Sequence, residues 1–230
     1  MSSSGGEPDE RWTAVDRYVG DLFIPADPAL DDALKASDAA GLPPINVSPA
    51  QGKMLHLFAR MVGARRILEV GTLGGYSTIW LARALAPGGR LVTLESEARH
   101  ADVARRNIAR AGLSEFVDVR LGRAADSLPA IAAEHQDPFD FVFIDADKPG
   151  NADYFAWALK LTRRGSVIVV DNVVRAGHVV DATSTDANVL GVRRFNEFAA
   201  REPRVSVTEV QTVGVKGYDG FALAVVTSDP

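Results

Sequence analysis

Short apolar runs alternate along this chain with longer stretches in which apolar and polar residues recur at helical spacing. The apolar runs predict strands at residues 66–70, 90–95, 116–121, 139–145 and 166–171. The stretches around them predict helices at about residues 49–62, 75–86, 97–111, 126–134 and 151–162. Strands that alternate with helices in this way indicate a doubly wound parallel sheet.

The pattern changes near the end of the chain. A helix is predicted at about residues 186–201, and two more strands follow at residues 204–210 and 221–226. The segment that joins these strands contains Gly214, Gly217 and Gly220, which suits an antiparallel hairpin added to the sheet. We therefore expect an α/β fold with a Rossmann-like, seven-stranded sheet, mostly parallel, with an antiparallel C-terminal hairpin.

The amino-terminal part divides into two segments. Residues 1–10 are polar and glycine-rich, which predicts a disordered tail. Residues 11–41 contain helical material broken by Pro25 and Pro28. The predicted organisation is a tail at residues 1–10 and one domain at residues 11–230.

Composition excludes several classes of protein. The 25 basic and 30 acidic residues give a net charge of −5, which argues against a general partner for nucleic acid or anionic membranes. The absence of cysteine excludes disulfides, thiolate zinc sites and a cysteine nucleophile. No apolar run approaches 18 residues and no signal-peptide pattern is present, so we expect a cytoplasmic location.

Two neighbouring strands are predicted to end in acidic or amide side chains. The strand at residues 139–145 ends in Asp145, and the strand at residues 166–171 ends in Asp171, followed by Asn172. The carboxyl ends of parallel strands open onto the crevice where such sheets bind ligands. Three oxygen ligands there would suit a hard cation such as Mg²⁺ or Ca²⁺. The alternative is that these side chains cap the segments that follow them.

Lys148 follows Asp145 by one short turn. A divalent cation lowers the pKa of a hydroxyl group bound to it, and a lysine beside the cation can accept the proton of that hydroxyl. The alternative is an ordinary surface lysine at the start of a helix.

A glycine turn follows the first parallel strand. The segment from Glu69 to Ser77 contains a G-x-x-G-G pattern, which differs from the G-x-G-x-x-G fingerprint of dinucleotide sites. Glu69 would repel a pyrophosphate and attract a cationic ligand. Glu95, at the end of the next strand, can accept hydrogen bonds from both hydroxyls of a ribose. The alternative is that both glutamates cap the following helices or remain solvated.

A nucleoside with a positive charge fits these features, and S-adenosylmethionine is such a ligand. From about residue 46 to the C-terminal strand, the chain resembles the cation-dependent O-methyltransferases, the family of caffeoyl-CoA and catechol O-methyltransferases. The matching motifs lie at residues 51–53, 68–78, 144–148, 171–174 and 211–220. The resemblance implies the fold of class I enzymes that use S-adenosylmethionine, and it makes a homodimer the expected assembly.

The resemblance also assigns roles to residues. It implies a metal site of Asp145, Asp171 and Asn172 for Mg²⁺, with Ca²⁺ or Mn²⁺ as alternatives, and catalytic roles for Lys148, as the base, and Asp145. The resemblance places Val47, Glu69, Gly71, Ser77, Glu95, Ala124 and Asp145 or Asp147 around the methyl donor. Thr72 and Tyr154 are further candidates for this pocket, and core packing is the alternative for Tyr154. Catechol O-methyltransferase has a tryptophan at the position of Asp147, whereas the caffeoyl-CoA and bacterial branches have an aspartate.

The expected activity is methylation of one hydroxyl of a vicinal diphenol, a small-molecule phenolic acceptor. Residues 11–45 and the loop at residues 173–188 are expected to form the acceptor pocket, with Arg175 or His178 as candidate contacts. The sequence leaves the acceptor and its regioselectivity open. Two alternatives are an NAD-type oxidoreductase, disfavoured by Glu69, and a non-catalytic module that binds S-adenosylmethionine, disfavoured by the intact metal set and Lys148.

Overall fold

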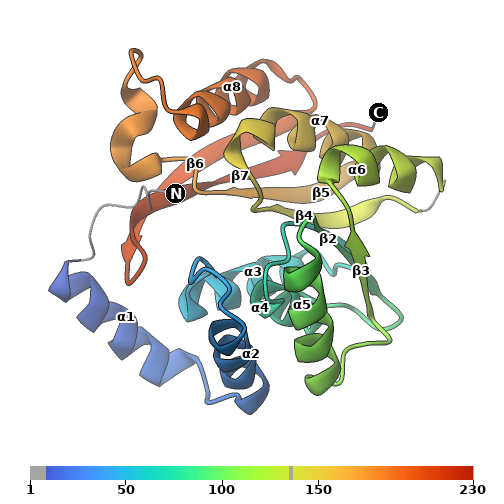
Figure 1. The fold of residues 1–230 in the computed structure, drawn as a ribbon. Coiled ribbons are helices and arrows are strands. Elements are labelled where there is room, and N and C mark those ends of the chain that lie inside the picture. The colour runs from blue at the N-terminus through green and yellow to red at the C-terminus, as the bar shows by residue number, and fades with distance from the viewer. Residues whose placement is uncertain (1–8, 135–136, 230) are drawn as a thin grey trace.

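The computed structural model describes residues 9–134 and 137–229, and a single mixed sheet runs through them (Figure 1). The strands lie in the order β3-β2-β1-β4-β5-β7-β6. Pairing is parallel from β3 to β5 and antiparallel where β7 joins β5 and β6. The strands are β1 (Arg66–Val70), β2 (Arg90–Glu95), β3 (Val117–Leu121), β4 (Phe139–Ile144), β5 (Thr162–Asp171), β6 (Val205–Gly214) and β7 (Gly217–Val226). This arrangement confirms the predicted fold class.

Helices cover both faces of the sheet (Figure 1). One layer contains α6 (Ala124–Ala133), α7 (Asn151–Leu161) and α8 (Ala187–Arg201), and the other contains α3 (Pro49–Met61), α4 (Tyr76–Ala82) and α5 (Ala98–Arg110). Two short 3-10 helices, η1 (Lys148–Gly150) and η2 (Arg175–Val180), follow the carboxyl ends of β4 and β5. Side chains alternate between the two faces of each strand, so Phe141 joins the core under α3–α5 and Val142 joins the core under α6–α8.

Two helices precede this alternation. They are α1 (Glu10–Phe23) and α2 (Pro28–Ala39), and they are separated at Pro25 and Pro28 as predicted. The boundary predicted for the tail is wrong at its end, because Asp9 caps α1 through the backbone N–H of Arg11 and Glu10 begins the helix. Residues 1–8 lie outside the described part of the chain, so the predicted disorder there is untested.

Three strands extend further than predicted. The strand β5 begins at Thr162 and not at residue 166, because residues 163–165 form an irregularity in its pairing with β4. The hydroxyl of Ser166 closes this irregularity by donating a hydrogen bond to the carbonyl oxygen of Phe139, at 2.7 Å. The strands β6 and β7 also continue to a tight turn at residues 215–216, so Gly214, Gly217 and Gly220 belong to strands and do not form a long connection.

The end of one helix and the extent of one loop also differ from the prediction. The helix α4 ends at Ala82 and not near residue 86. The backbone N–H of Ala86 instead donates to the carbonyl of Ala64, at 2.8 Å, in the loop that leads to β2. The loop predicted at residues 173–188 contains η2, and α8 already begins at Ala187, capped by Asp186. The order of elements is nevertheless as predicted.

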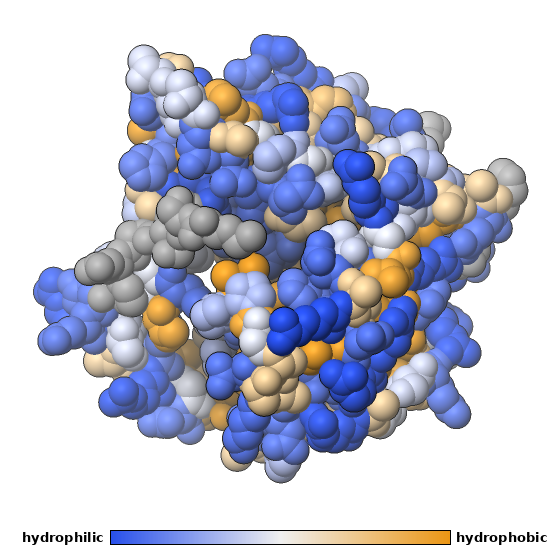
Figure 2. Space-filling model, in the orientation of Figure 1, coloured by the Kyte–Doolittle hydropathy of each residue, from blue (hydrophilic) through white to orange (hydrophobic). Residues whose placement is uncertain are grey.

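The outer surface is largely polar. Figure 2 shows hydrophilic residues over most of the face in view, with hydrophobic groups in separate patches. No helix in the part of the chain that the structure describes has the length and apolar character needed to cross a bilayer.

The contact of α8 with η1 depends on the absence of a side chain at Gly191. A Cβ atom there would lie 2.3 Å from the carbonyl oxygen of Lys148. Gly191→Ala should therefore lower the free energy of unfolding by about 1–3 kcal/mol through overpacking, as measured by urea unfolding.

Gly20 supplies a matched control, because a Cβ atom there would meet nothing within 4 Å. Gly20→Ala should raise the free energy of unfolding by up to about 1 kcal/mol through helix propensity. Equal stability of the two variants would contradict the close contact between α8 and η1.

Candidate functional site

Acidic side chains gather at the carboxyl edge of the parallel strands. Glu69, Glu95 and Asp171 hold strand positions whose side chains face the α3–α5 layer, by the same alternation that places Phe141 there. Asp145 follows β4 directly, and its backbone N–H donates to the carbonyl of Val70 in the neighbouring strand, at 2.8 Å. The sheet thus brings together the acidic residues that the sequence placed at separate strand ends.

The turn after β1 approaches Asp145 closely. Gly71 has a φ of +103°, and its N–H donates to the carbonyl of Leu94 at 3.0 Å. A Cβ atom on Gly71 would lie 2.2 Å from the carbonyl oxygen of Asp145. Both the backbone conformation and the available space therefore require glycine at this position.

Glu69 is completely buried among hydroxyl groups. Its carboxylate accepts hydrogen bonds from Ser77 (2.7 Å) and Thr78 (2.5 Å) on α4 and from Thr93 (2.7 Å) on β2. Burial raises the pKa of Glu69 to about 7, the hydroxyl donors oppose that shift, and the negative charge of Asp145 adds to it. The negative charge predicted for this position is thus shielded, and of its three hydroxyl donors only Ser77 is partly exposed.

Glu95 is oriented by backbone donors. Its Oε2 atom accepts the N–H of Leu73 at 2.7 Å, and its Oε1 atom accepts the N–H of Glu97 at 3.0 Å. His100 lies 3.6 Å from Oε1. A carboxylate has about four lone-pair positions, so Glu95 retains capacity for further donors such as hydroxyl groups.

Asp145 and Lys148 form a short ion pair beside the turn. The Nζ atom of Lys148 lies 2.8 Å from Oδ1 of Asp145, and the lysine is buried with 7% of its surface exposed. The alternative of an ordinary surface lysine is therefore wrong. The 3-10 helix η1 presents Lys148, and α8 packs against the backbone of that lysine.

Asp171 is buried at the end of β5 and held from two sides. Its Oδ1 atom accepts the N–H of Asn172 at 2.9 Å, and its Oδ2 atom accepts the side-chain amide of Gln51 at 2.7 Å. Burial and the negative charge of Asp145 raise the pKa of Asp171 to about 7, while Lys148 opposes the shift. The carboxylates of Asp145 and Asp171 are therefore close enough to repel each other.

This donor set suits a hard dication. Two mutually repelling carboxylates attract positive charge, and an amide oxygen of Asn172 would add a third oxygen ligand. Asn172 has a φ of +56°, which marks a sharp backbone turn directly after Asp171. No group of three or more His, Cys, Asp or Glu side chains is placed to hold a metal among the residues described, so the predicted site depends on the amide.

The remaining predicted cofactor residues follow β1, β3 and β4, except Val47, which precedes α3. Asp147 caps η1 through the N–H of Gly150 (3.2 Å) and accepts the hydroxyl of Tyr154 at 2.5 Å. Burial and this aspartate both raise the pKa of Tyr154. Three further residues have other placements: Val47 is buried before α3, Thr72 is hydrogen-bonded to Thr93 at 2.5 Å, and Ala124 begins α6 after β3.

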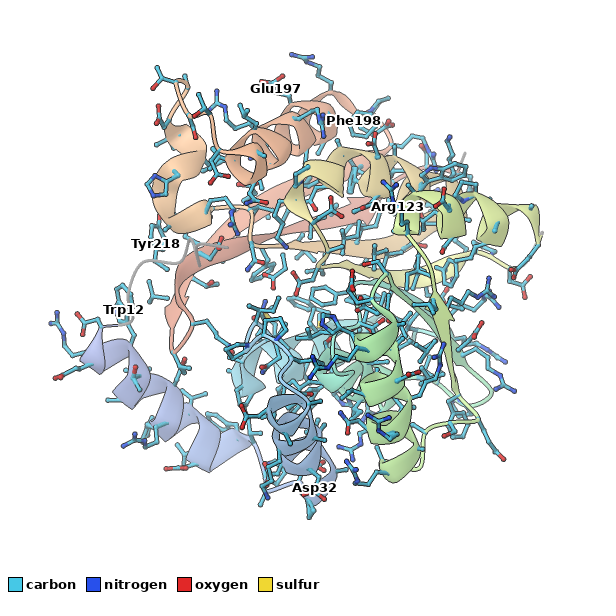
Figure 3. All side chains as sticks on the ribbon, in the orientation of Figure 1. Trp12, Asp32, Arg123, Glu197, Phe198 and Tyr218 are labelled. Atoms are coloured by element: carbon cyan, nitrogen blue, oxygen red, sulfur yellow. The ribbon has the colours of Figure 1, made fainter. Side chains whose placement is uncertain are left out.

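The candidate acceptor contacts differ from each other. Arg175 lies 3.7 Å from Asp219, whose carboxylate also accepts the backbone N–H of Arg175, so its guanidinium is directed at the β6–β7 hairpin. His178 is exposed on η2. Tyr218 of the hairpin lies beside the same segment, because a Cβ atom on Gly177 would come within 3.4 Å of its ring (Figure 3).

Sequence reasoning assigned no role to Gln51, Thr78 or Thr93. Thr93 could have been found from strand register, because it is the residue directly paired with Glu69 on β2. Gln51 belongs to a motif that marked the resemblance, but its contact with Asp171 spans 120 positions of sequence.

Comparisons with known proteins agree on one family. A family model described as O-methyltransferase matches residues 26–225. The chain is 53% identical over 213 residues to a protein from Niastella koreensis named catechol O-methyltransferase. The aligned region covers 93% of this chain and 96% of that protein. A protein of the same name from Mycobacterium tuberculosis is 53% identical over 212 residues, with 92% and 94% covered.

Solved structures give the same result. An O-methyltransferase from Bacillus cereus, in complex with SAH, has a TM-score of 0.93 and 61% identity over 94% of this chain and 99% of its own. The O-methyltransferase TomG from Streptomyces achromogenes, involved in tomaymycin synthesis and solved with SAM, has a TM-score of 0.92 and 54% identity, with 95% and 98% covered. The resemblance inferred from the motifs is confirmed.

The burial of Glu69 generates a pH dependence of stability. Its pKa is about 7 in the folded chain against an ordinary value of 4.5, so between these values the folded state holds a proton that the unfolded chain has released. The stability of the wild type relative to Glu69→Gln should therefore fall as pH rises through this window. The total change should be about 3 kcal/mol, measured by urea unfolding across the pH range. A difference that stays constant with pH would show that Glu69 titrates normally.

Proposed function

Because this chain belongs to the O-methyltransferase family, we propose that it methylates one hydroxyl of a catechol-like acceptor, using S-adenosylmethionine and a divalent cation. The observation that carries the proposal is the cluster of Asp145, Lys148 and Asp171 at adjoining strand ends. The name of the two relatives at 53% identity supports the class of acceptor. The complexes of similar enzymes with SAM and SAH support the methyl donor.

The methyl donor would bind along the carboxyl ends of β1 and β2. The turn at Gly71 lies against the backbone of Asp145 and so brings the ends of β1 and β4 together there. Glu95 keeps acceptor capacity for the ribose hydroxyls, and the acidic edge favours the sulfonium and amino groups. Ala124, Asp147 and Tyr154 follow β3 and β4 and would complete the pocket.

The divalent cation, proposed as Mg²⁺, would be held by Asp145, Asp171 and Asn172. A cation held by these residues would supply positive charge that lowers the pKa of an acceptor hydroxyl. Gln51 fixes the orientation of the Asp171 carboxylate, and Lys148 fixes that of Asp145. Each carboxylate therefore has a donor from the protein that limits its rotation.

Lys148 would accept the phenolic proton in its uncharged form, which a dication held beside it would favour over the ammonium. The phenolate oxygen would then attack the methyl carbon in line, with the C–O bond forming as the C–S bond breaks and sulfur keeping both electrons. Holding both reactants in this geometry can contribute about 7–11 kcal/mol to catalysis.

The alternatives are weaker. The family match over residues 26–225 favours methyl transfer over an oxidoreductase. A binding module without catalysis would have no use for the buried pair of Lys148 and Asp145. The homodimer, expected from the resemblance alone, and the identity of the acceptor both stay predictions.

Methylation of catechol should require both a divalent cation and Lys148. EDTA should abolish turnover, added Mg²⁺ should restore it, and Lys148→Met should lower kcat by about 100-fold or more because general-base catalysis is lost. Product formation from S-adenosylmethionine and catechol measures all three.

Lys160→Met is the matched control, because Lys160 lies over the ring of Trp157 on α7, outside the site. Calorimetry with S-adenosylhomocysteine should show that Lys148→Met still binds the nucleoside. Full turnover in EDTA would remove the metal from the proposal, and full turnover by Lys148→Met would remove the base.

Gln51 should control metal affinity, because hydrogen bonds to a metal ligand orient it. Gln51→Leu should weaken Mg²⁺ binding to metal-stripped protein by about 10- to 100-fold, measured by titration calorimetry. Its helix is held in register at Gly52, where a Cβ atom would lie 2.5 Å from the ring of Trp80.

Arg60→Leu, an exposed position on the last turn of the same helix, is the control and should leave Mg²⁺ binding unchanged. If Gln51→Leu lowers stability while the affinity for Mg²⁺ is retained, Gln51 has only a packing role.

A further inference from the structure

The β6–β7 hairpin extends beyond the rest of the sheet on the side of the candidate site. Pairing between β5 and β7 ends at Asp171 and Phe221, whereas β6 and β7 stay paired up to Gly214 and Gly217. A strand rises by about 3.3 Å per residue, so the turn lies roughly 15 Å beyond Phe221 along the hairpin. Figure 1 shows this end of the hairpin leaving the sheet and approaching α1.

The tip of the hairpin is fixed at two points. The N–H of Val215 donates to Oδ2 of Asp16 on α1 at 2.7 Å, and Nζ of Lys216 donates to the carbonyl of Pro44 at 2.9 Å. A Cβ atom on Gly214 would lie 2.4 Å from the same Asp16 oxygen. The tip therefore lies against the segment that leads into Val47 and α3.

Lys216 brings a positive charge to this place without an acidic partner. Among the residues described, it forms no salt bridge, and its bond to Pro44 uses one of its three N–H donors. Asp219, the nearby acid on β7, is already bonded to Val174 and Arg175. Two donors of the Lys216 ammonium are thus open to a ligand.

The positive charge of Lys216 interacts electrostatically with Asp145 at the candidate metal site. Partial burial lowers the pKa of the Lys216 amino group, and the negative charge of Asp145 opposes that shift. An acceptor held by its two hydroxyls near Asp145 and Asp171 would direct the opposite side of its ring away from these carboxylates. The hairpin tip, with Lys216, projects past the same strand ends.

We propose that Lys216 binds an anionic substituent of the acceptor, so that the preferred acceptors are catechols that carry a carboxylate. This inference rests on the proposed function, since it takes the acceptor to be a vicinal diol bound at Asp145 and Asp171. The ammonium attracts a carboxylate at the far side of the ring and repels an amine there. The only other role that its contacts support is a clasp between the hairpin and Pro44.

A charge series of acceptors separates these roles. The values of kcat/KM are compared for protocatechuate, catechol and dopamine, whose ring substituents are anionic, absent and cationic. The wild type should prefer protocatechuate to catechol by about 10-fold, the effect of one charged hydrogen bond. Lys216→Met should remove that preference with little change for catechol, and Lys216→Glu should shift the preference towards dopamine.

Lys216→Arg keeps the charge and should keep the preference. Lys35→Met is the matched control, because Lys35 is exposed on α2 and lies near only Asp32. An equal loss on all three acceptors in Lys216→Met would mean a structural clasp and would overturn the inference. Failure of the wild type to methylate any of the three would instead overturn the proposed function, and the inference with it.

Discussion

The carboxyl edge of the sheet has to hold several negative charges in a buried environment, and the compensation of those charges determines the local structure. Glu69 and Asp171 both have a pKa raised to about 7 by burial. An unpaired buried carboxylate is costly, so each of these acids accepts at least one hydrogen bond from the protein. The donors come from different elements: hydroxyls of α4 and β2 for Glu69, the amide of Gln51 on α3 for Asp171, and the ammonium of Lys148 for Asp145.

Close backbone packing makes this compensation possible. The turn at Gly71 brings β1 against the carbonyl of Asp145, and Gly191 allows α8 to press on the backbone of Lys148. Gly52 similarly allows α3 to approach Trp80, which sets where Gln51 reaches the sheet. Small residues at element contacts thus define the positions of the charged groups, although none of these glycines carries a functional atom.

The compensation differs among the acids in a way that suits their proposed roles. The Glu69 carboxylate is enclosed by three hydroxyls and serves as a fixed part of the interior. Asp145 and Asp171 repel each other and have few donors, which leaves a need for additional positive charge. Lys216 is a separate cation on the hairpin, bonded to the carbonyl of Pro44. We propose a site that combines an acidic end for a dication with a basic end for the ring substituent of the acceptor.

The sequence by itself determined the order of strands and helices, because burial on both faces of parallel strands produces continuous apolar runs that end in polar residues. It also identified Glu69, Glu95, Asp145, Lys148 and Asp171, since each lies at or next to a predicted strand end. Only the tertiary structure showed that Gln51 contacts Asp171 and that Lys216 contacts Pro44. Those contacts join residues far apart in sequence through helix packing and strand register, and neither leaves a local pattern in the chain.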